Sequence, residues 1–184
     1  MINEMIGAPR NTPNLEALKI WVDGLLSGQF EQGQGRLAQC SVDSFGVRGP
    51  EQYCCLGVIS ELSIRHGLDV HRNEVSSYGE IVFEYDGQRD FLPPKVREWL
   101  GIENESPSLL VTLSDGTKQP RNASALNDGE AGDSLDFAAR DGWGNPLRTY
   151  LPGYTFRDIA LAIIRTYHLP GYEHLLEEAD VKTD

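Results

Sequence analysis

The stretch Gln52-Tyr53-Cys54-Cys55-Leu56-Gly57-Val58 opens the segment around which we expect the fold to be built. Cys55, Ile59 and Leu62 recur at the spacing of one helical face, and Gly67 is a typical helix stop. The pattern predicts a helix from about Gln52 to His66 whose apolar face lies in the core.

The rest of the sequence predicts further helices towards both ends of the chain and short strands between them. Helices are expected from Thr12-Pro13 to Gly28, from Pro93-Pro94 to Trp99-Leu100-Gly101, behind the capping box Thr155-Phe156-Arg157-Asp158 as far as Pro170, and from Tyr172 to Ala179. Strands are expected near Arg36–Ser41, at Ile81–Tyr85, at Leu109–Leu113 and near Lys118, with Asp86-Gly87 as a hairpin turn into a returning strand at Gln88–Phe91. This order predicts an α+β fold with about four helices packed on a small antiparallel sheet.

The length of 184 residues fits one domain with a normal core. Residues 1–11 are expected to be a flexible arm, residues 12–179 a single globular domain, and residues 180–184 a tail. Within the domain, residues 129–154 are rich in Gly, Asp and aromatic residues and predict an irregular inserted loop.

The charge of the chain limits the classes of partner. Asp and Glu number 28 against 16 Lys and Arg, which gives a formal net charge of −12. Binding of long nucleic acid by phosphate neutralisation needs clustered cations and is therefore excluded. Small molecules, basic protein surfaces and DNA mimicry remain open.

The cysteines and the N-terminus indicate the cytoplasm. Cys40, Cys54 and Cys55 are an odd number with two adjacent, which does not suit a disulfide framework, and no Cys or His spacing indicates zinc. We therefore expect reduced thiols, no metal and no cofactor. The N-terminus does not fit a signal peptide and no apolar run fits a membrane span, so we expect no membrane partner.

Cys54 is a candidate nucleophile. In the first turn of a helix, backbone N–H groups favour a thiolate, and the amide of Gln52 could help to bind an oxyanion, as in a papain-like site. A base is also required. His66 is excluded because it lies at the far end of the same helix, about 18 Å away, and His71, His168 and His174 stay open as candidates. The alternative is that Cys54 and Cys55 are buried core residues and that Gly57 allows another element to come close.

Two neighbouring features form a candidate ligand site. Asn127 and Asp128 could present an amide and a carboxylate to a ligand, or could serve as ordinary turn and cap residues. Behind them, aromatic and cationic side chains could stack on a planar ligand and pair with its phosphates, or could fold the loop back onto the domain. These residues are Arg140, Trp143, Arg148, Tyr150 and Tyr154. The few cations suit a mononucleotide or dinucleotide.

Several short segments together carry a resemblance to a known family. They are Trp21 with Leu25-Leu26-Ser27-Gly28, Gln32-Gly33, Tyr53-Cys54-Cys55-Leu56-Gly57-Val58, Phe91-Leu92-Pro93, Trp99-Leu100-Gly101, Leu126-Asn127-Asp128 and Thr155-Phe156-Arg157-Asp158-Ile159-Ala160. In this order, over residues 15–167, the chain resembles a family of small accessory proteins of tailed bacteriophages, usually without an assigned function. The family pattern runs from Leu-Asn-Asp to the Thr-Phe helix within a few residues, whereas residues 129–154 intervene here.

The resemblance implies a non-structural phage product that acts in the host cytoplasm, and it implies no reaction. We carry three hypotheses for the function. The first is a counter-defence or host-takeover protein that sequesters a nucleotide-type signal or a host protein with a basic face. The second is a cysteine-dependent hydrolase or transferase that uses Cys54. The third is an acidic DNA mimic that inhibits a DNA-binding protein. The oligomeric state is left open.

Overall fold

The computed structural model describes residues 12–77, 79–112, 117–129, 135–140, 146–148 and 154–181. In these ranges the chain forms an α+β fold. The helices are α1 (Leu15–Leu26), α2 (Cys55–Arg65), α3 (Pro94–Leu100), α4 (Ala123–Asp128), α5 (Phe156–Tyr167) and α6 (Glu173–Val181). The strands are β1 (Glu31–Gln32), β2 (Ala38–Ser41), β3 (Gln52–Tyr53), β4 (Arg72–Ser77), β5 (Glu80–Tyr85), β6 (Ser108–Thr112), β7 (Lys118–Asn122), β8 (Leu135–Arg140) and β9 (Pro146–Arg148).

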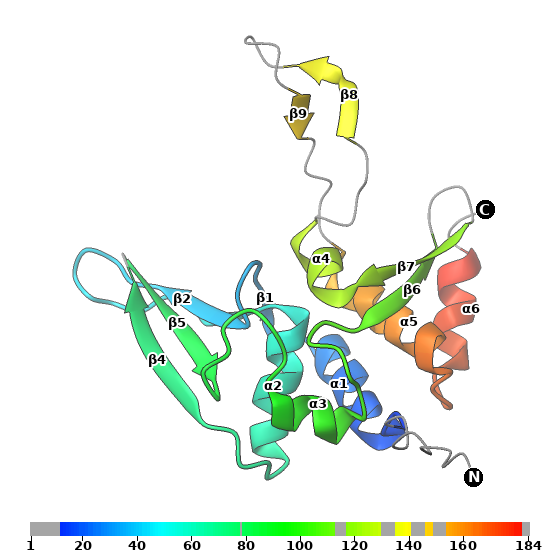
Figure 1. Cartoon of the computed structure of the whole chain (residues 1–184), viewed down its shortest axis with the longest axis horizontal. Helices are drawn as coiled ribbons and strands as arrows, with labels where there is room; N and C mark the ends of the chain where they lie inside the picture. The colour runs from blue at the N-terminus through cyan, green and yellow to red at the C-terminus, as the bar shows by residue number, and fades with distance from the viewer. Residues whose placement is uncertain are drawn as a thin grey trace, which may run out of the picture.

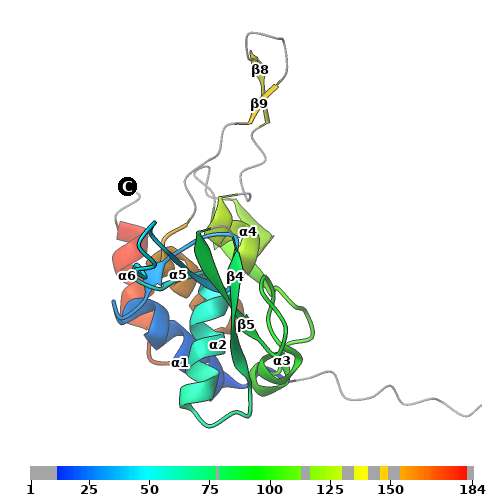
Figure 2. The same cartoon turned by 90° about the vertical axis from the view of Figure 1, so that its left-hand side faces the viewer.

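Two helices, α1 and α2, occupy the middle of the molecule (Figure 1). A five-stranded sheet of order β1-β3-β2-β5-β4 lies on one side of them, and α5, α6 and the β6–β7 ribbon lie on the other. Seen from the side of the sheet, β4 and β5 are in front and α2 runs alongside them (Figure 2). No helix of the described ranges is long and apolar enough to cross a bilayer.

The core forms where α1 packs against α2 and α5. Trp21 and Leu18 of α1 are fully buried, and the indole N–H of Trp21 donates to the backbone oxygen of Cys55 over 2.8 Å. The buried face of α5 runs from Phe156 to Ile164, while Tyr167 is only half-buried. The capping box between Thr155 and Asp158 is also confirmed, with both backbone N–H groups bound.

The helix starts at both α1 and α2 differ from the prediction. Helix α2 begins at Cys55 with Cys54 as its N-cap, because Gln52 and Tyr53 form β3, which pairs with β1 and β2. Helix α1 begins at Leu15, with Asn14 rather than Thr12 as its cap. The Asn14 side chain accepts from the N–H of Ala17 and donates to the backbone oxygen of Trp99, which fixes the cap by a tertiary contact.

The sheet is mixed, and the predicted hairpin after β5 is wrong. Strand β5 pairs with β2 on one side and with the preceding strand β4 on the other, so it has no edge left for a returning strand at residues 88–91. The tight turn at Asp86-Gly87 does exist, with positive φ at both residues, but only one isolated bridge follows it. The parallel pairing of β1 with β3 also departs from the expected antiparallel sheet.

The other predicted elements agree more closely with the structure. Helix α3 ends at Gly101 in the left-handed conformation, and β6 pairs with β7 as an antiparallel ribbon. The described helices number six rather than about four; the short helices α3 and α6 were expected at these places, and α4 was not expected to be a helix. Residues 129–154 were expected to be irregular, but β8 and β9 pair within them. The predicted turn at residues 114–116 lies outside the described residues.

Candidate functional site

The side chain of Asn127 joins segments that are far apart in the sequence. It is fully buried at the end of α4. Its Oδ1 accepts from the backbone N–H of Cys55 over 3.1 Å and from Nε2 of Gln32 over 3.2 Å. Its Nδ2 donates to the backbone oxygen of Gly33 over 2.8 Å and to Oδ1 of Asp128 over 2.9 Å. Two donated and two accepted bonds use the full capacity of an amide side chain.

Gln32 extends this network to the start of α5. Its Nε2 also donates to the backbone oxygen of Tyr154 over 2.8 Å, and its Oε1 accepts from the N–H of Phe156 over 3.0 Å. We call Gln32 and Asn127 the Gln32–Asn127 centre. The centre connects β1, the first turn of α2, α4 and the start of α5, which are four of the segments that carry the family resemblance. The amide groups of Gln32 and Asn127 bind each other and the backbone of these segments. We therefore assign both residues the role of positioning the segments relative to one another.

The two ends of residues 129–154 meet at this centre. The N–H of Tyr154 donates to the backbone oxygen of Leu126 over 2.9 Å. Asp128 is half-buried, and its Oδ1 accepts from the N–H of Gly35 over 2.9 Å. The segment between them therefore leaves and re-enters the fold at one place.

The remaining predicted ligand residues lie within this segment. Arg140 ends β8 and Arg148 ends β9, so pairing of the two strands holds their backbones in one hairpin. Trp143 and Tyr150 lie outside the described residues. Tyr154 is half-buried and packs against the core. The ligand role of these residues stays a prediction.

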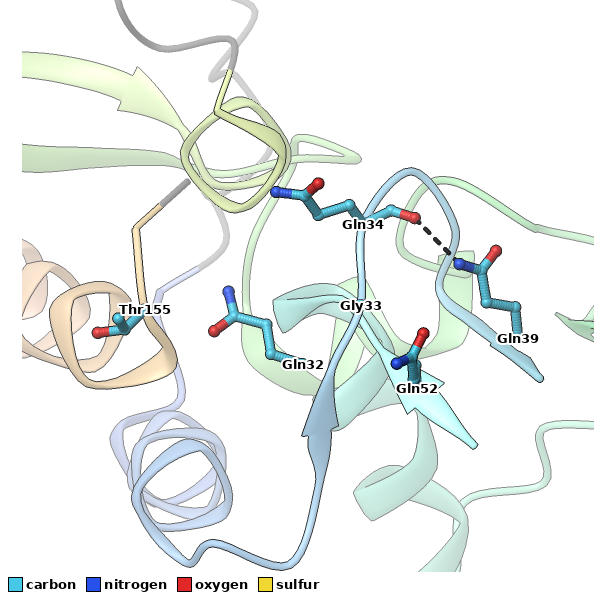
Figure 3. Close-up of a pocket in the computed structure, with 6 residues that line it drawn as sticks. All are labelled: Gln32, Gly33, Gln34, Gln39, Gln52 and Thr155. Carbon is cyan, nitrogen blue, oxygen red and sulfur yellow. Dashed lines mark hydrogen bonds between the residues drawn. The ribbon is translucent and has the colours of Figure 1, made fainter. Parts of the chain in front are cut away.

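A pocket of about 490 Å³ lies beside the centre (Figure 3). It is lined by Gln32, Gly33, Gln34, Gln39, Gln52 and Thr155. Gln39 of β2 and Gln52 of β3 are partners in the register of the sheet. Nε2 of Gln39 lies 3.5 Å from the backbone oxygen of Gln34, and Nε2 of Gln52 donates to Glu31 over 2.7 Å. Their Oε1 atoms accept no hydrogen bond from the described residues, so each amide has a free acceptor and a free N–H.

The pocket therefore offers neutral hydrogen-bonding edges. An amide presents a donor and an acceptor in one plane, which matches another amide or the edge of a nucleobase. No cation of the described residues lines the pocket, so this lining does not provide charge pairing for phosphate. Sequence reasoning missed Gln34 and Gln39, and it assigned Gln52 a different role, as an oxyanion donor for Cys54. The available signal was the richness of residues 29–50 in Gln and Gly.

The environment of Cys54 differs from that of an activated nucleophile. The side chain is 3% exposed, and its Sγ accepts from the N–H of Gly57 over 3.4 Å. Burial raises the pKa of the Cys54 thiol from 9.0 to about 12, although the backbone N–H groups act to lower it. The expected decrease in its pKa is therefore wrong. No hydrogen bond joins Sγ to a histidine among the described residues.

The neighbours of Cys54 belong to the core. Cys55 is fully buried, and its thiol donates to the backbone oxygen of Ala123 over 3.4 Å. A Cβ at Gly57 would lie 1.6 Å from the backbone oxygen of Leu37, so only glycine fits there. These contacts agree with the alternative that the Cys-Cys-Leu-Gly segment packs the centre of the fold.

Comparison with known proteins identifies the family but no activity. No curated protein and no solved structure matches the chain. Residues 14–167 match a family model described as a domain of unknown function, DUF8296. Since this range covers most of the chain, the protein belongs to the DUF8296 domain family.

Proposed function

We propose that the protein is a bacteriophage accessory protein that binds a small ligand through a nucleobase-like edge. It would act in the host cytoplasm and sequester a nucleotide-type signal of host defence. The observation that carries the proposal is the pair of free carboxamide edges of Gln39 and Gln52 in a pocket of about 490 Å³. This volume lies in the range of small-molecule sites.

The position of residues 129–154 supports the same assignment. Both ends of this segment are bound at the Gln32–Asn127 centre, beside the pocket of about 490 Å³ lined by Gln32, Gln34, Gln39 and Gln52, which we call the glutamine pocket. A nucleotide held by its base in the pocket would need cations for its phosphates. Arg36 and Arg48 are closer to the pocket in the sequence, but they pair with Asp90 and Glu74, so Arg140 and Arg148 of this segment are our candidates for the phosphates.

Binding fits the described residues better than catalysis or DNA mimicry. A buried thiol with a raised pKa does not supply the thiolate that cysteine catalysis needs. DNA mimicry needs unpaired carboxylates on one face, whereas Glu74, Asp90 and Glu84 each pair with an arginine.

A ligand panel tests the proposal. The full chain is heated with nucleosides, mononucleotides and cyclic dinucleotides, and melting is followed by fluorescence. At a ligand concentration about 100 times Kd we expect a rise in Tm of about 5 °C or more. The double variant Gln39→Leu/Gln52→Leu should lose this rise, while Gln29→Leu, which changes an exposed glutamine outside the pocket, should keep it. Absence of a shift with every member of the panel would refute nucleotide binding.

A second candidate function is the capture of a host protein, because one loop presents apolar side chains to solvent. Phe45 is 90% exposed and Val47 is 62% exposed. Oδ1 of Asp43 accepts from the N–H groups of both residues, over 2.9 Å and 2.8 Å, so the loop is held in shape by its own hydrogen bonds. A preorganised aromatic side chain is typical of protein interfaces.

This alternative predicts recovery of one host protein with a basic surface in stoichiometric amount by the native chain. The variant Phe45→Ser should lose that protein, and Gln39→Leu/Gln52→Leu should retain it. Equal recovery by Phe45→Ser would exclude the loop as the interface.

A further inference from the structure

A second pocket, of about 410 Å³, lies at the other end of α5. It forms where the end of α5 meets α6 and the β6–β7 ribbon, which lie together in Figure 1. Its lining residues are Leu110, Lys118, Ile164, Arg165, His168, Leu169, Glu173 and Leu176. The N–H of Leu110 donates to Oγ1 of Thr166 over 2.7 Å, which fixes β6 against α5.

The floor and the rim of this pocket differ in chemistry. Leu110 and Leu176 are half-buried and Ile164 and Leu169 are buried, so the floor is apolar. The rim carries the basic side chains of Lys118, Arg165 and His168 together with one acid, Glu173. Both carboxylate oxygens of Glu173 accept from the N–H of Gly171 over 3.1 Å, so this carboxylate already has a partner of its own.

The side chain of Lys118 is exceptional among the lysine and arginine side chains that the structure describes, because it makes neither an ion pair nor a hydrogen bond. The other cations whose side chains the structure describes have partners. For example, Lys95 lies 3.4 Å from Asp69 and 3.5 Å from Asp86, and Arg48 pairs with Glu74 over 2.8 Å. A free cation beside an apolar floor is complementary to a ligand that is both anionic and apolar.

Of Arg165 and Lys118, only Arg165 has a structural reason for its place at the rim of the pocket. Arg165 lies in the last turn of α5, where a cation interacts favourably with the helix dipole. Lys118, in contrast, comes from β7 and lies at the rim of the pocket without any partner among the described residues.

We propose that this pocket binds an anionic group carried on an apolar body, such as the carboxylate or phosphate ester of a short hydrocarbon. Lys118 pairs with the anionic group and the leucine-rich floor takes the apolar body. The site is separate from the glutamine pocket. Helix α5 has 12 residues, so its two ends lie about 18 Å apart at a rise of about 1.5 Å per residue.

A fluorescent probe with the same chemistry tests the inference. Anilinonaphthalene sulfonate carries an anion on an aromatic body, and its emission rises on binding to an apolar site. With the folded full chain we expect saturable binding, weakened about fivefold by Lys118→Gln, the loss expected for one ion pair. Lys19→Gln is the matched control, because Lys19 lies on α1 and pairs with Glu16. It should bind the probe as the parent does.

Competitors separate the contributions of the anion and the apolar body. Decanoate and decyl phosphate should displace the probe from the parent, and the stronger of the two identifies the preferred anionic group. Decanol and inorganic phosphate should displace it weakly. Equal displacement by decanol, equal displacement by inorganic phosphate, or unchanged probe binding by Lys118→Gln would each overturn the proposal.

Two further variants separate probe binding at this pocket from ligand binding at the glutamine pocket, on which the proposed function rests. Leu176→Gln changes the floor and should weaken probe and decanoate binding, provided that its near-ultraviolet circular dichroism matches that of the parent. Gln39→Leu/Gln52→Leu changes only the glutamine pocket and should leave probe binding unchanged. Loss of probe binding in that double variant would place the probe in the glutamine pocket and refute a separate site.

Discussion

The two ends of α5 belong to one helix with a continuous buried face, yet their polar groups are used differently. At the N-terminal end, the capping box and the Gln32–Asn127 centre bind their polar groups to other parts of the chain, and only the glutamine pocket beside them keeps free amide edges. At the C-terminal end, Lys118 lies over an apolar floor without a partner among the described residues. The difference teaches that buried, fully bonded polar groups hold the fold, and that ligand binding is to be sought in groups with unused bonds.

The largest expected effect tests the close packing beside the Gln32–Asn127 centre. The variant Gly57→Ala should lose more than about 4 kcal/mol of unfolding free energy or fail to fold, because its Cβ would meet the backbone of Leu37. Gly24→Ala is the control, since its Cβ would meet side chains and not backbone: Cδ1 of Leu62 at 2.3 Å and Cγ1 of Val58 at 3.2 Å. Because the helical preference of alanine offsets part of this crowding, that variant should change stability by less than about 2 kcal/mol. Urea unfolding measures both, and a parent-like midpoint for Gly57→Ala would contradict this packing.

The next effect tests whether Asn127 holds the fold. Asn127→Ala removes four hydrogen bonds and leaves the N–H of Cys55 and the oxygen of Gly33 buried without their partner. We expect a loss of about 3 kcal/mol in unfolding free energy. Asn122→Ala, at an exposed asparagine whose side chain makes no cap bond, should cost less than about 0.5 kcal/mol. Similar losses for the two variants would remove the positioning role of Asn127.

The third effect is alkaline sensitivity at Cys54. Because burial raises its pKa from 9.0 to about 12, the unfolded thiol ionises first as the pH rises. The contribution of Cys54 to stability is therefore complete below pH 9 and is lost as the pH rises towards 12, with a slope of about 1.4 kcal/mol per pH unit.

The variant Cys54→Ala isolates this slope. Burial also raises the pKa of Tyr53 and Tyr85, but these groups are common to both proteins, so the difference in slope belongs to Cys54. Urea midpoints from pH 8 to 11 measure it. Rapid alkylation of Cys54 in the native protein at neutral pH would contradict the buried, protonated thiol and restore the hydrolase hypothesis.

The smallest effect concerns the groups that we assign to ligands. Gln52→Ala at one end of α5 and Lys118→Gln at the other should each change the unfolding free energy by less than about 0.5 kcal/mol, because neither side chain supports the core. Thermal and urea unfolding without ligand provide the measurement. A loss above about 1 kcal/mol at either position would show that the residue serves the fold and would remove it from the groups available to a ligand.

Local chemistry explains which parts of the fold were predictable. The capping box of α5, the left-handed Gly101 after α3 and the strand at Ile81–Tyr85 depend on neighbouring residues and were predicted. Strand β4 was missed because Arg72–Ser77 is polar and lies at the edge of the sheet, where no apolar pattern is required. Gln52-Tyr53 was assigned to a helix because its strand partners are distant in the sequence.

The candidate site also has features that the local sequence predicts and features that depend on the tertiary structure. Asn127 and Asp128 were selected from their residue types, but their role depends on Gln32, Gly33 and Gly35, which only the tertiary structure brings close. Gln39 and Gln52 become a pair through the register of β2 and β3. The pKa of Cys54 was predicted in the wrong direction because the desolvation that raises it comes from packing, while the helix start that lowers it is visible in the sequence.

The hydrogen bond between Tyr154 and Leu126 has a consequence for how such proteins diversify. Since the chain returns to its point of departure, residues 129–154 form a cassette that can be shortened, lengthened or exchanged. The entropic cost of a loop rises only slowly with its length, so the rest of the domain should tolerate cassettes of many lengths. A shared scaffold of helices and sheet can thus carry a different segment in each member of the family, and this segment can change without redesign of the core.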